Sequence, residues 1–221
     1  MKNYLLLSSS FDNFLRDLRR PFNRANQNSK IVQISPLDNE FVKIFAAFKE
    51  VKEALEVVSK IPVFIDSTNF IDPHDGYLTL RYHCDGLLNE SYILKERMIA
   101  LIDLLIKHYK NQKQALEEIE EIRENVFELM KNILEARRIH THKRRVGLRI
   151  LPDLEMFYMF ELSGNDETDI KIVEKKQKEV KEFASKIIKS IESIVDLYCK
   201  QITPYLLTKD GQICVPKRKV A

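Results

Sequence analysis

Apolar residues recur at steps of three and four along several long stretches of this chain, the spacing of an amphipathic helix. The first stretch follows Ser35-Pro36-Leu37-Asp38, in which Ser35 is a good N-cap and Pro36 suits the first helical position. Its apolar stripe comprises Phe41, Ile44, Phe45, Phe48, Val51, Leu55 and Val58. Because Pro62 lacks a backbone N–H, we expect it to stop this helix, which we place over residues 36–60.

The same spacing predicts three further long helices. They lie within residues 80–109, from about Gln112 to Glu135, and from Asp166 to just before Pro204. Gly86 and Asn89 are weak helix formers, which leaves open a start of the second helix after Gly86. Predicted buried residues of the second and last helices include Leu80, Cys84, Leu87, Leu94, Met98, Leu105, Val173, Val180, Ile191 and Tyr198.

The rest of the chain is less regular. Residues 1–34 are predicted as an irregular N-terminal extension with a short helix that ends near Arg20-Pro21. Asp72-Pro73 and Asp75-Gly76 are turn signals in the stretch before the second helix. The apolar run after Pro152-Asp153 suits a short helix, although Phe157, Tyr158 and Phe160 also have strand propensity. We prefer the helix, because nothing else in the chain offers a pairing strand.

These elements indicate an all-α protein, an antiparallel bundle of four to five long amphipathic helices. We assign the bundle to residues 35–205, the N-terminal extension to 1–34 and a basic C-terminal tail to 206–221. The hydrophobic fraction of 44% is sufficient for a core, and five glycines without any tryptophan argue against a turn-rich β protein. A net charge of +3 is too weak to indicate a partner.

Cysteine usage and hydropathy narrow the class of protein. Cys84, Cys199 and Cys214 are widely spaced, which predicts buried apolar groups and favours neither a disulfide framework nor a zinc site. No stretch approaches the roughly 20 apolar residues of a membrane span, so no membrane association is expected. The leucine run near the N-terminus is too short for a signal sequence. We expect a cytoplasmic protein without a metal or other cofactor.

Charge is strongly segregated around one stretch, residues 137–149, which we call the basic segment. It has no acidic residue, and its charged or titratable residues are Arg137, Arg138, His140, His142, Lys143, Arg144, Arg145 and Arg149. The helix before it carries six glutamates between Glu117 and Glu128 on its predicted outer face. Such a segment either binds a polyanion or phosphate, or is a solvated helix end with cations near its own C-terminal dipole.

Arginine and histidine together provide the parts for cleaving RNA without a metal. Imidazole exchanges a proton near neutral pH, and guanidinium holds phosphate oxygens and stabilises a more negative transition state. On an unbroken helix Arg138 and His142 share a face, so Arg138 is the natural partner of His142. Arg137 joins them only if the helix ends or distorts before His142. Lys95, Glu96 and Arg97 either line the same cleft or form a solvated face, which we favour.

The hexapeptide Arg137-Arg138-Ile139-His140-Thr141-His142 resembles the Arg-x(4–6)-His motif of HEPN domains at its shortest spacing. Those domains are helical bundles with the motif late in the chain, between or at the ends of long helices, as here. In many of them a polar residue, most typically Asn, follows the arginine, whereas this chain has Arg138.

The resemblance implies a metal-independent endoribonuclease, often found in toxin–antitoxin, phage-defence or RNA-processing settings. Its catalytic residues are then Arg137, Arg138 and His142. We assign RNA contacts to a further set, namely His140, Lys143, Arg144, Arg145 and Arg149. The family commonly works as a homodimer with two motifs facing one cleft, so a second copy and an antitoxin are expected partners.

Two alternatives need no catalysis. One is a helical module that binds RNA, a nucleotide or a protein partner through the basic segment. The other is a structural dimer, in which the basic segment of one copy lies against the acidic helix of a second copy. His74 is expected at the surface in all of these alternatives.

Overall fold

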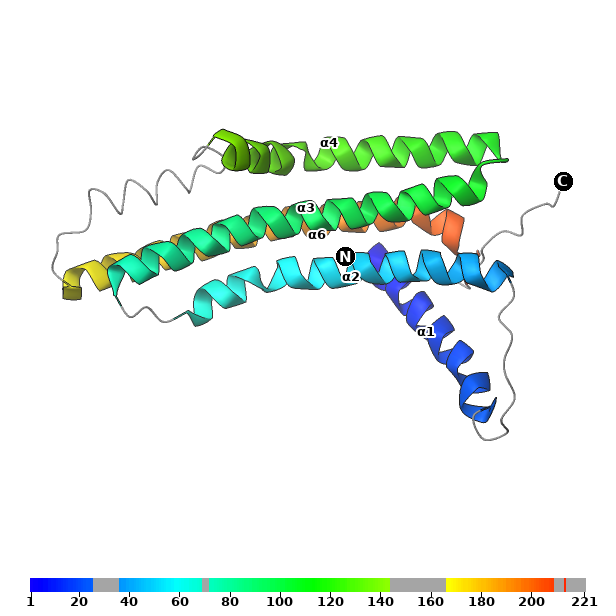
Figure 1. Ribbon diagram of the computed structural model, residues 1–221, viewed down its shortest axis with the longest axis horizontal. Helices are drawn as coiled ribbons and strands as arrows, with labels where there is room; N and C mark the ends of the chain where they lie inside the picture. The colour runs from blue at the N-terminus through cyan, green and yellow to red at the C-terminus, as the bar shows by residue number, and fades with distance from the viewer. Residues whose placement is uncertain (26–35, 69–71, 144–165, 209–212, 214–221) are drawn as a thin grey trace. The chain divides into compact units, whose positions relative to one another are not determined.

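The computed structural model describes residues 1–25, 36–68, 72–143, 166–208 and 213 (Figure 1). The elements are α1 Lys2–Ala25, α2 Pro36–Ser67, α3 Pro73–Tyr109, α4 Lys113–Lys143 and α6 Asp166–Leu206. Within the described residues the only strand-like pairing is an isolated antiparallel bridge between Leu207 and Ile213. The prediction of an all-α helical bundle is confirmed.

The chain forms two compact units, and α2, α3, α4 and α6 contribute to both. Unit 1 comprises Met1–Val51, Arg97–Val126 and Glu192–Ala221, whereas unit 2 comprises Lys52–Glu96 and Phe127–Ile191. Within each unit the α2 and α3 segments run in opposite directions (Figure 1). The predicted apolar stripes form the cores of these units. Leu80, Leu87, Leu94, Met98, Leu105, Val173, Val180, Ile191 and Tyr198 are all buried.

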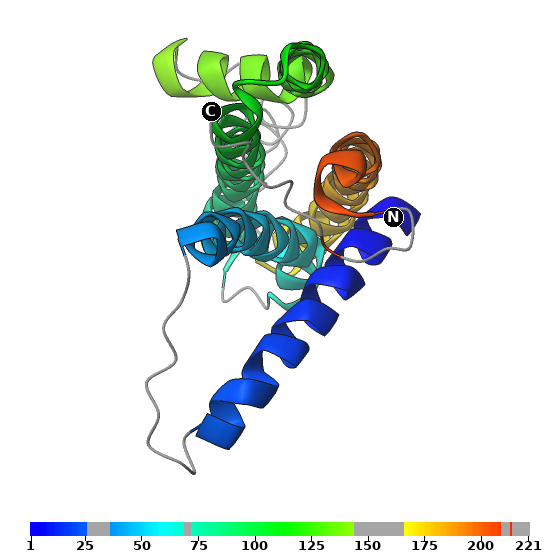
Figure 2. The same ribbon diagram turned by 90° about the vertical axis from the view of Figure 1, so that its right-hand side faces the viewer.

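Unit 1 contains α1, which is longer than the short helix predicted for this region. The ring of Phe11 stacks on Phe48 with centroids 4.7 Å apart, and this contact anchors α1 on α2. Figure 2 shows the first turns of α1 beside the last turns of α6. There the Asp196 carboxylate accepts hydrogen bonds from the Tyr4 backbone N–H and the Asn3 amide, each at 3.0 Å. Burial raises the pKa of Asp196, but these hydrogen bonds outweigh it and lower the pKa overall.

Unit 2 contains the site described below, and there α6 contacts the end of α2. The side-chain amide of Gln177 donates hydrogen bonds to the backbone carbonyls of Ile65 and Thr68. Lys181 on α6 forms an ion pair with Asp66 at 2.7 Å. These contacts attach the end of α2 to residues 177–181 of α6.

Helices continue through all three prolines that were expected to end them, and in α1 the helix runs past Pro21 to Ala25. Pro62 lies inside α2, which continues to Ser67, and Pro204 lies inside α6, which continues to Leu206. Burial explains the continuation at Pro62 and Pro204, because Ile65 and Leu206 lie in the core beyond them. A proline removes one backbone hydrogen bond, and the tertiary contacts of the last turn outweigh that loss.

The second helix also begins earlier than a start after Gly86 would allow. Pro73 occupies its first turn, and the Asp72 carboxylate caps it by accepting a hydrogen bond from the Asp75 backbone N–H at 2.7 Å. Tyr77 and Leu80 are buried on the resulting turns. The turn signals therefore mark the helix start, and α3 continues through Gly86.

The other predictions along the chain have mixed outcomes. The predicted gap between the second helix, ending at residue 109, and the third, beginning at about Gln112, is confirmed, whereas α4 continues past Glu135 to Lys143. Cys84 and Cys199 are buried free thiols, and burial raises the pKa of each to about 12. His74 is exposed as expected.

Some predictions fall on residues that the structure does not describe. The helix proposed after Pro152-Asp153 lies outside the described residues, as do residues 209–212 and 214–221 of the basic tail, which include Cys214. None of the described helices is long and apolar enough to cross a membrane.

Gly86 offers a test of how α3 is stabilised. A Cβ atom built at this residue meets nothing within 4 Å, and the backbone is helical. Gly86→Ala is therefore expected to raise the free energy of unfolding by about 0.5–1 kcal/mol, measured by urea denaturation. Ala100→Gly, at an exposed residue of the same helix, is the control and is expected to lower it. A less stable Gly86→Ala protein would contradict the open packing around Gly86.

Candidate functional site

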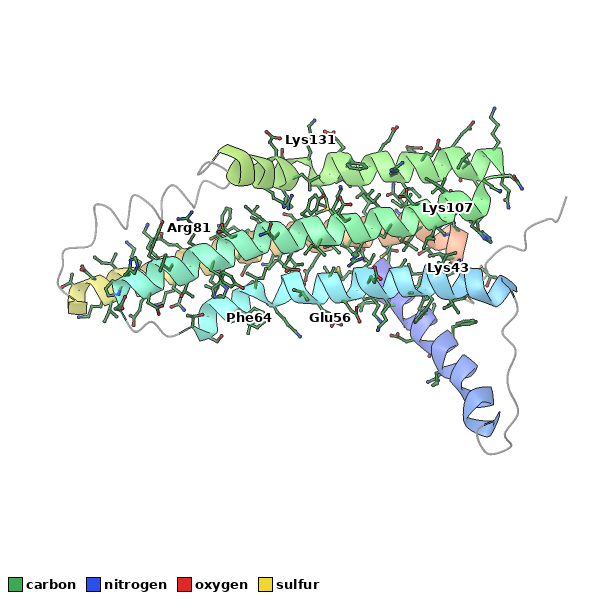
Figure 3. All side chains as sticks on the ribbon, in the orientation of Figure 1. Lys43, Glu56, Phe64, Arg81, Lys107 and Lys131 are labelled. Carbon is green, nitrogen blue, oxygen red and sulfur yellow. The ribbon has the colours of Figure 1, made fainter. Side chains whose placement is uncertain are left out.

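Arg137 is the one residue of the basic segment whose side chain the structure describes, and it is turned toward α3. Its guanidinium carbon lies 3.9 Å from the centroid of the Tyr92 ring. Its Nε donates a hydrogen bond to Asn89 Oδ1 at 3.2 Å. Stacking on an aromatic face while donating to a fixed acceptor is an arrangement that the planar guanidinium favours. Lys131, an earlier cation on α4, lies instead on the exposed face (Figure 3).

A second cation shares the Tyr92 ring. Lys95 Nζ lies 5.2 Å from the centroid of Tyr92 and 4.5 Å from that of Phe127 on α4. Lys95 also pairs with the neighbouring Glu96 carboxylate. Only 6% of Lys95 is exposed, so the expectation of a solvated face is wrong for this residue. Two rings and one carboxylate replace the water that a buried ammonium loses. Arg97, by contrast, is exposed and pairs with Glu50 in unit 1.

We call Asn89, Tyr92, Lys95, Glu96, Phe127 and Arg137 the cation–aromatic cluster. Glu96 provides its negative charge. The hydrogen bond from Lys95 is the largest cause that lowers the Glu96 pKa, and the Lys95 charge, a Tyr92 hydrogen bond and the Arg137 charge act in the same direction. Burial acts in the opposite direction and is outweighed. Glu96 is therefore ionised at neutral pH, and the cluster holds two cations and one anion.

The cluster ties the end of α4 to α3. Arg137 and Phe127 come from α4, whereas Asn89, Tyr92 and Lys95 come from α3. The Arg137 guanidinium is engaged by an aromatic face and an amide oxygen, with a carboxylate close enough to interact with its charge. These contacts attach Arg137 to α3. Its predicted catalytic role stays a prediction.

The backbone is helical throughout Arg137–His142, because α4 ends only at Lys143. On such a helix Arg138 and His142 lie one turn apart on one face, whereas Arg137 and His142 are about 140° apart. The distortion that a direct Arg137–His142 pairing requires is therefore absent between these two residues. The side chains of Arg138, His140, His142 and Lys143 lie outside the description. Arg144, Arg145 and Arg149 lie outside the described residues altogether.

The glutamate-rich face of α4 is exposed, as predicted. Glu117, Glu118, Glu120, Glu121, Glu124 and Glu128 are all exposed. Several have local partners, such as Lys131 for Glu128 at 3.2 Å and the Tyr205 hydroxyl for Glu118. The acidic face of α4 is therefore solvated, with ion pairs and hydrogen bonds to nearby side chains. Contact of this face with the basic segment of a second copy stays a prediction.

Sequence reasoning missed Tyr92 and Phe127, the rings on which the site depends. One signal for the buried Lys95 was present, since it falls at a helical step between the apolar residues Leu88 and Met98. A lysine in such a position needs an internal partner. Asn89 was noted only as a weak helix former, and its contact with Arg137 joins residues 48 apart in the chain.

Comparison with protein-family models, with curated proteins and with solved structures finds no match to this chain. Among the described residues no group of three or more His, Cys, Asp or Glu side chains could hold a metal ion.

A double-mutant cycle tests whether Tyr92 and Arg137 stabilise each other. Tyr92→Leu and Arg137→Met are each expected to lower the free energy of unfolding, with a coupling energy of about 0.5–2 kcal/mol in the cycle. Urea denaturation of the four proteins gives this energy. Tyr92→Phe is the matched control, because it keeps the aromatic face and is expected to retain the coupling with Arg137. Strictly additive effects of the Leu and Met substitutions would show that the stack contributes nothing.

Proposed function

We propose that this chain is an RNA-binding helical module whose ligand contacts come from the basic segment beyond Arg137. The observation that carries the proposal is the engagement of Arg137 by Tyr92 and Asn89, which fixes the start of the basic segment against α3. The proposed contact residues are Arg138, His140, His142, Lys143, Arg144, Arg145 and Arg149.

The charge of these residues supports a polyanionic ligand. Five of them are permanent cations at neutral pH, and no acidic residue separates them. Lysine and arginine bind phosphates by neutralising charge and releasing counterions, and guanidinium also holds two phosphate oxygens at once. Single-stranded RNA presents such phosphates in a flexible backbone that follows an extended basic surface. A cytoplasmic location is part of the proposal.

A second candidate is the HEPN-like endoribonuclease that the motif implies. The observation in its favour is the continuous helix over Arg138 and His142, which suits an arginine and a histidine acting on one phosphate. In this version Arg137 holds the helix that carries Arg138 and His142, and takes no part in the chemistry. The candidate includes a homodimer with two facing motifs and, in a toxin–antitoxin setting, a protein antitoxin.

Salt-dependent binding tests the proposal. Fluorescence anisotropy of a labelled single-stranded RNA gives the binding constant at each salt concentration. The logarithm of this constant is expected to fall linearly with the logarithm of the salt concentration. Replacing both Arg138 and Arg145 with alanine is expected to reduce that slope by about 1.4, since each lost contact with a single strand removes about 0.7. Lys131→Ala, at an exposed cation of α4 outside the segment, is the control and should leave the slope unchanged.

The same proteins separate binding from cleavage. Absence of RNA binding at low salt, or an unchanged slope in the Arg138/Arg145 double variant, would contradict the binding proposal. Cleavage of the RNA in EDTA that is lost in His142→Ala would establish the nuclease candidate instead. Cleavage by His142→Ala at the rate of the unsubstituted protein would exclude it.

A further inference from the structure

The outer face of α6 in unit 2 carries a row of lysines that lies apart from the cation–aromatic cluster. The structure describes every residue from 171 to 189, and the exposed cations of this stretch are Lys171, Lys175, Lys178, Lys186 and Lys189. Successive residues of a helix turn by about 100°, so these five residues fall within roughly 80° of arc. At 1.5 Å per residue they span about 27 Å along the helix axis. We call them the α6 lysine row.

The core of unit 2 explains why this face of α6 is turned to solvent. Val173, Val180 and Ile191 of the same helix are buried. They lie roughly 180° around the helix from the middle of the α6 lysine row. An amphipathic helix whose apolar stripe packs inward exposes the opposite face. The packing of α6 therefore holds all five lysines at the surface.

The charge of this face is strongly positive. Two exposed glutamates, Glu174 and Glu182, accompany the five lysines between residues 171 and 189. Glu182 lies within the row, whereas Glu174 lies about 60° to the side of Lys171. The exposed residues have a surplus of three positive charges, as large as the formal net charge of the whole chain. A surplus of this size on one helix face attracts a polyanion.

Internal ion pairs on α6 involve other lysines. Lys176 pairs with Glu179 at 3.0 Å, and Lys181 pairs with Asp66 of α2 at 2.7 Å. Within the part of the chain that the structure describes, no ion pair involves four members of the row, namely Lys171, Lys175, Lys178 and Lys186. A ligand that binds these four ammonium groups therefore displaces no internal carboxylate.

The composition of the face indicates which part of a nucleic acid it suits. Every exposed residue from Lys171 to Lys189 is charged, so the face presents no exposed aromatic ring on which a base could stack. Lysine offers a point charge on a flexible stem, which binds phosphate without fixing a geometry. The face therefore suits the sugar–phosphate backbone and lacks the groups that select a base sequence.

We propose that the α6 lysine row is a second contact surface for single-stranded RNA, which it binds through phosphates and without sequence preference. The choice of RNA rests on the proposed function. The row adds to that function a surface on a different helix from the basic segment, and its position is set by the buried residues of α6.

Fluorescence anisotropy of a labelled single-stranded RNA at several salt concentrations tests the row. Replacing Lys171, Lys175 and Lys178 with glutamine is expected to reduce the slope of log affinity against log salt by about 2, since each lost contact with a single strand removes about 0.7. Glutamine and lysine have similar helix propensities, so the helix content measured by circular dichroism should not change. Arginine at the same three positions keeps the charge and is expected to keep the slope.

A matched control removes three exposed lysines elsewhere on the chain. Lys43 and Lys60 of α2 and Lys107 of α3 are replaced with glutamine (Lys43 and Lys107 are labelled in Figure 3), and the slope should stay unchanged. Equal reductions in the control and the row variant would overturn the proposal, because net charge alone would then govern binding. An unchanged slope in the row variant would also overturn it.

The Arg138/Arg145 double variant, measured with the same RNA, separates the row from the basic segment. Reduced slopes in both variants would support both surfaces. A reduction in the Arg138/Arg145 variant alone would support the proposed function and overturn the row as a contact surface. A reduction in the row variant alone would support the row and contradict RNA contacts by the basic segment.

Light scattering without RNA tests for a different occupant of the row. A dimer that dissociates as salt rises, and that the row variant cannot form, would overturn the proposal. The acidic face of α4 in a second copy would then be the partner of the row. A row variant with the same oligomeric state as the unsubstituted protein, together with the reduced slope, would support RNA as the ligand.

Discussion

The ring of Tyr92 lies against two cations, and the attachment of the end of α4 depends on it. Arg137 stacks at 3.9 Å from α4, and Lys95 approaches at 5.2 Å from α3 itself. A cation–aromatic contact contributes about 0.5–2 kcal/mol, whereas removing one ion from water costs several kcal/mol. The ring alone therefore does not stabilise the buried Lys95. Phe127 and the Glu96 carboxylate supply the remainder, and they make the six residues of the cluster depend on one another.

The cluster changes how the basic segment is interpreted. The basic segment contains several cations and no acidic residue, as a single binding surface would. Its first cation, Arg137, packs on α3 instead. Arg137 contributes its charge to Glu96 and its planar face to Tyr92. The helix continues past Arg137, so Arg138 lies on a different face from Arg137 and need not share its contacts with α3. Ligand binding by the later residues and attachment by Arg137 are therefore compatible functions within one segment.

Periodicity was a good guide to the cores and a poor guide to the helix ends. The apolar stripes of α2, α3 and α6 were predictable because burial repeats with the helical turn, as for Leu80, Leu94 and Val180. Pro62, Gly86 and Pro204 were expected to limit helices, and α2, α3 and α6 continue through them. Each residue carries a local penalty of about 1–3 kcal/mol, which the buried residues on either side outweigh.

The site was harder to predict than the fold for a physical reason. Its charge could be read from sequence, but the contact of Arg137 with Asn89 and Tyr92 depends on how α4 lies against α3. Sequence spacing relates residues on one helix and does not give the register between two helices. The burial of Lys95 was the one accessible sign, because that lysine interrupts an apolar stripe.

Hydrogen exchange at the end of α4 tests the central claim most directly. If the Tyr92 ring attaches this end to α3, the backbone amides of residues 129–143 are protected in the unsubstituted protein and exchange faster in Tyr92→Leu. Tyr92→Phe should preserve their protection, and amides near the start of α4 should be unaffected by either substitution. Equal protection of residues 129–143 in Tyr92→Leu and the unsubstituted protein would contradict the account.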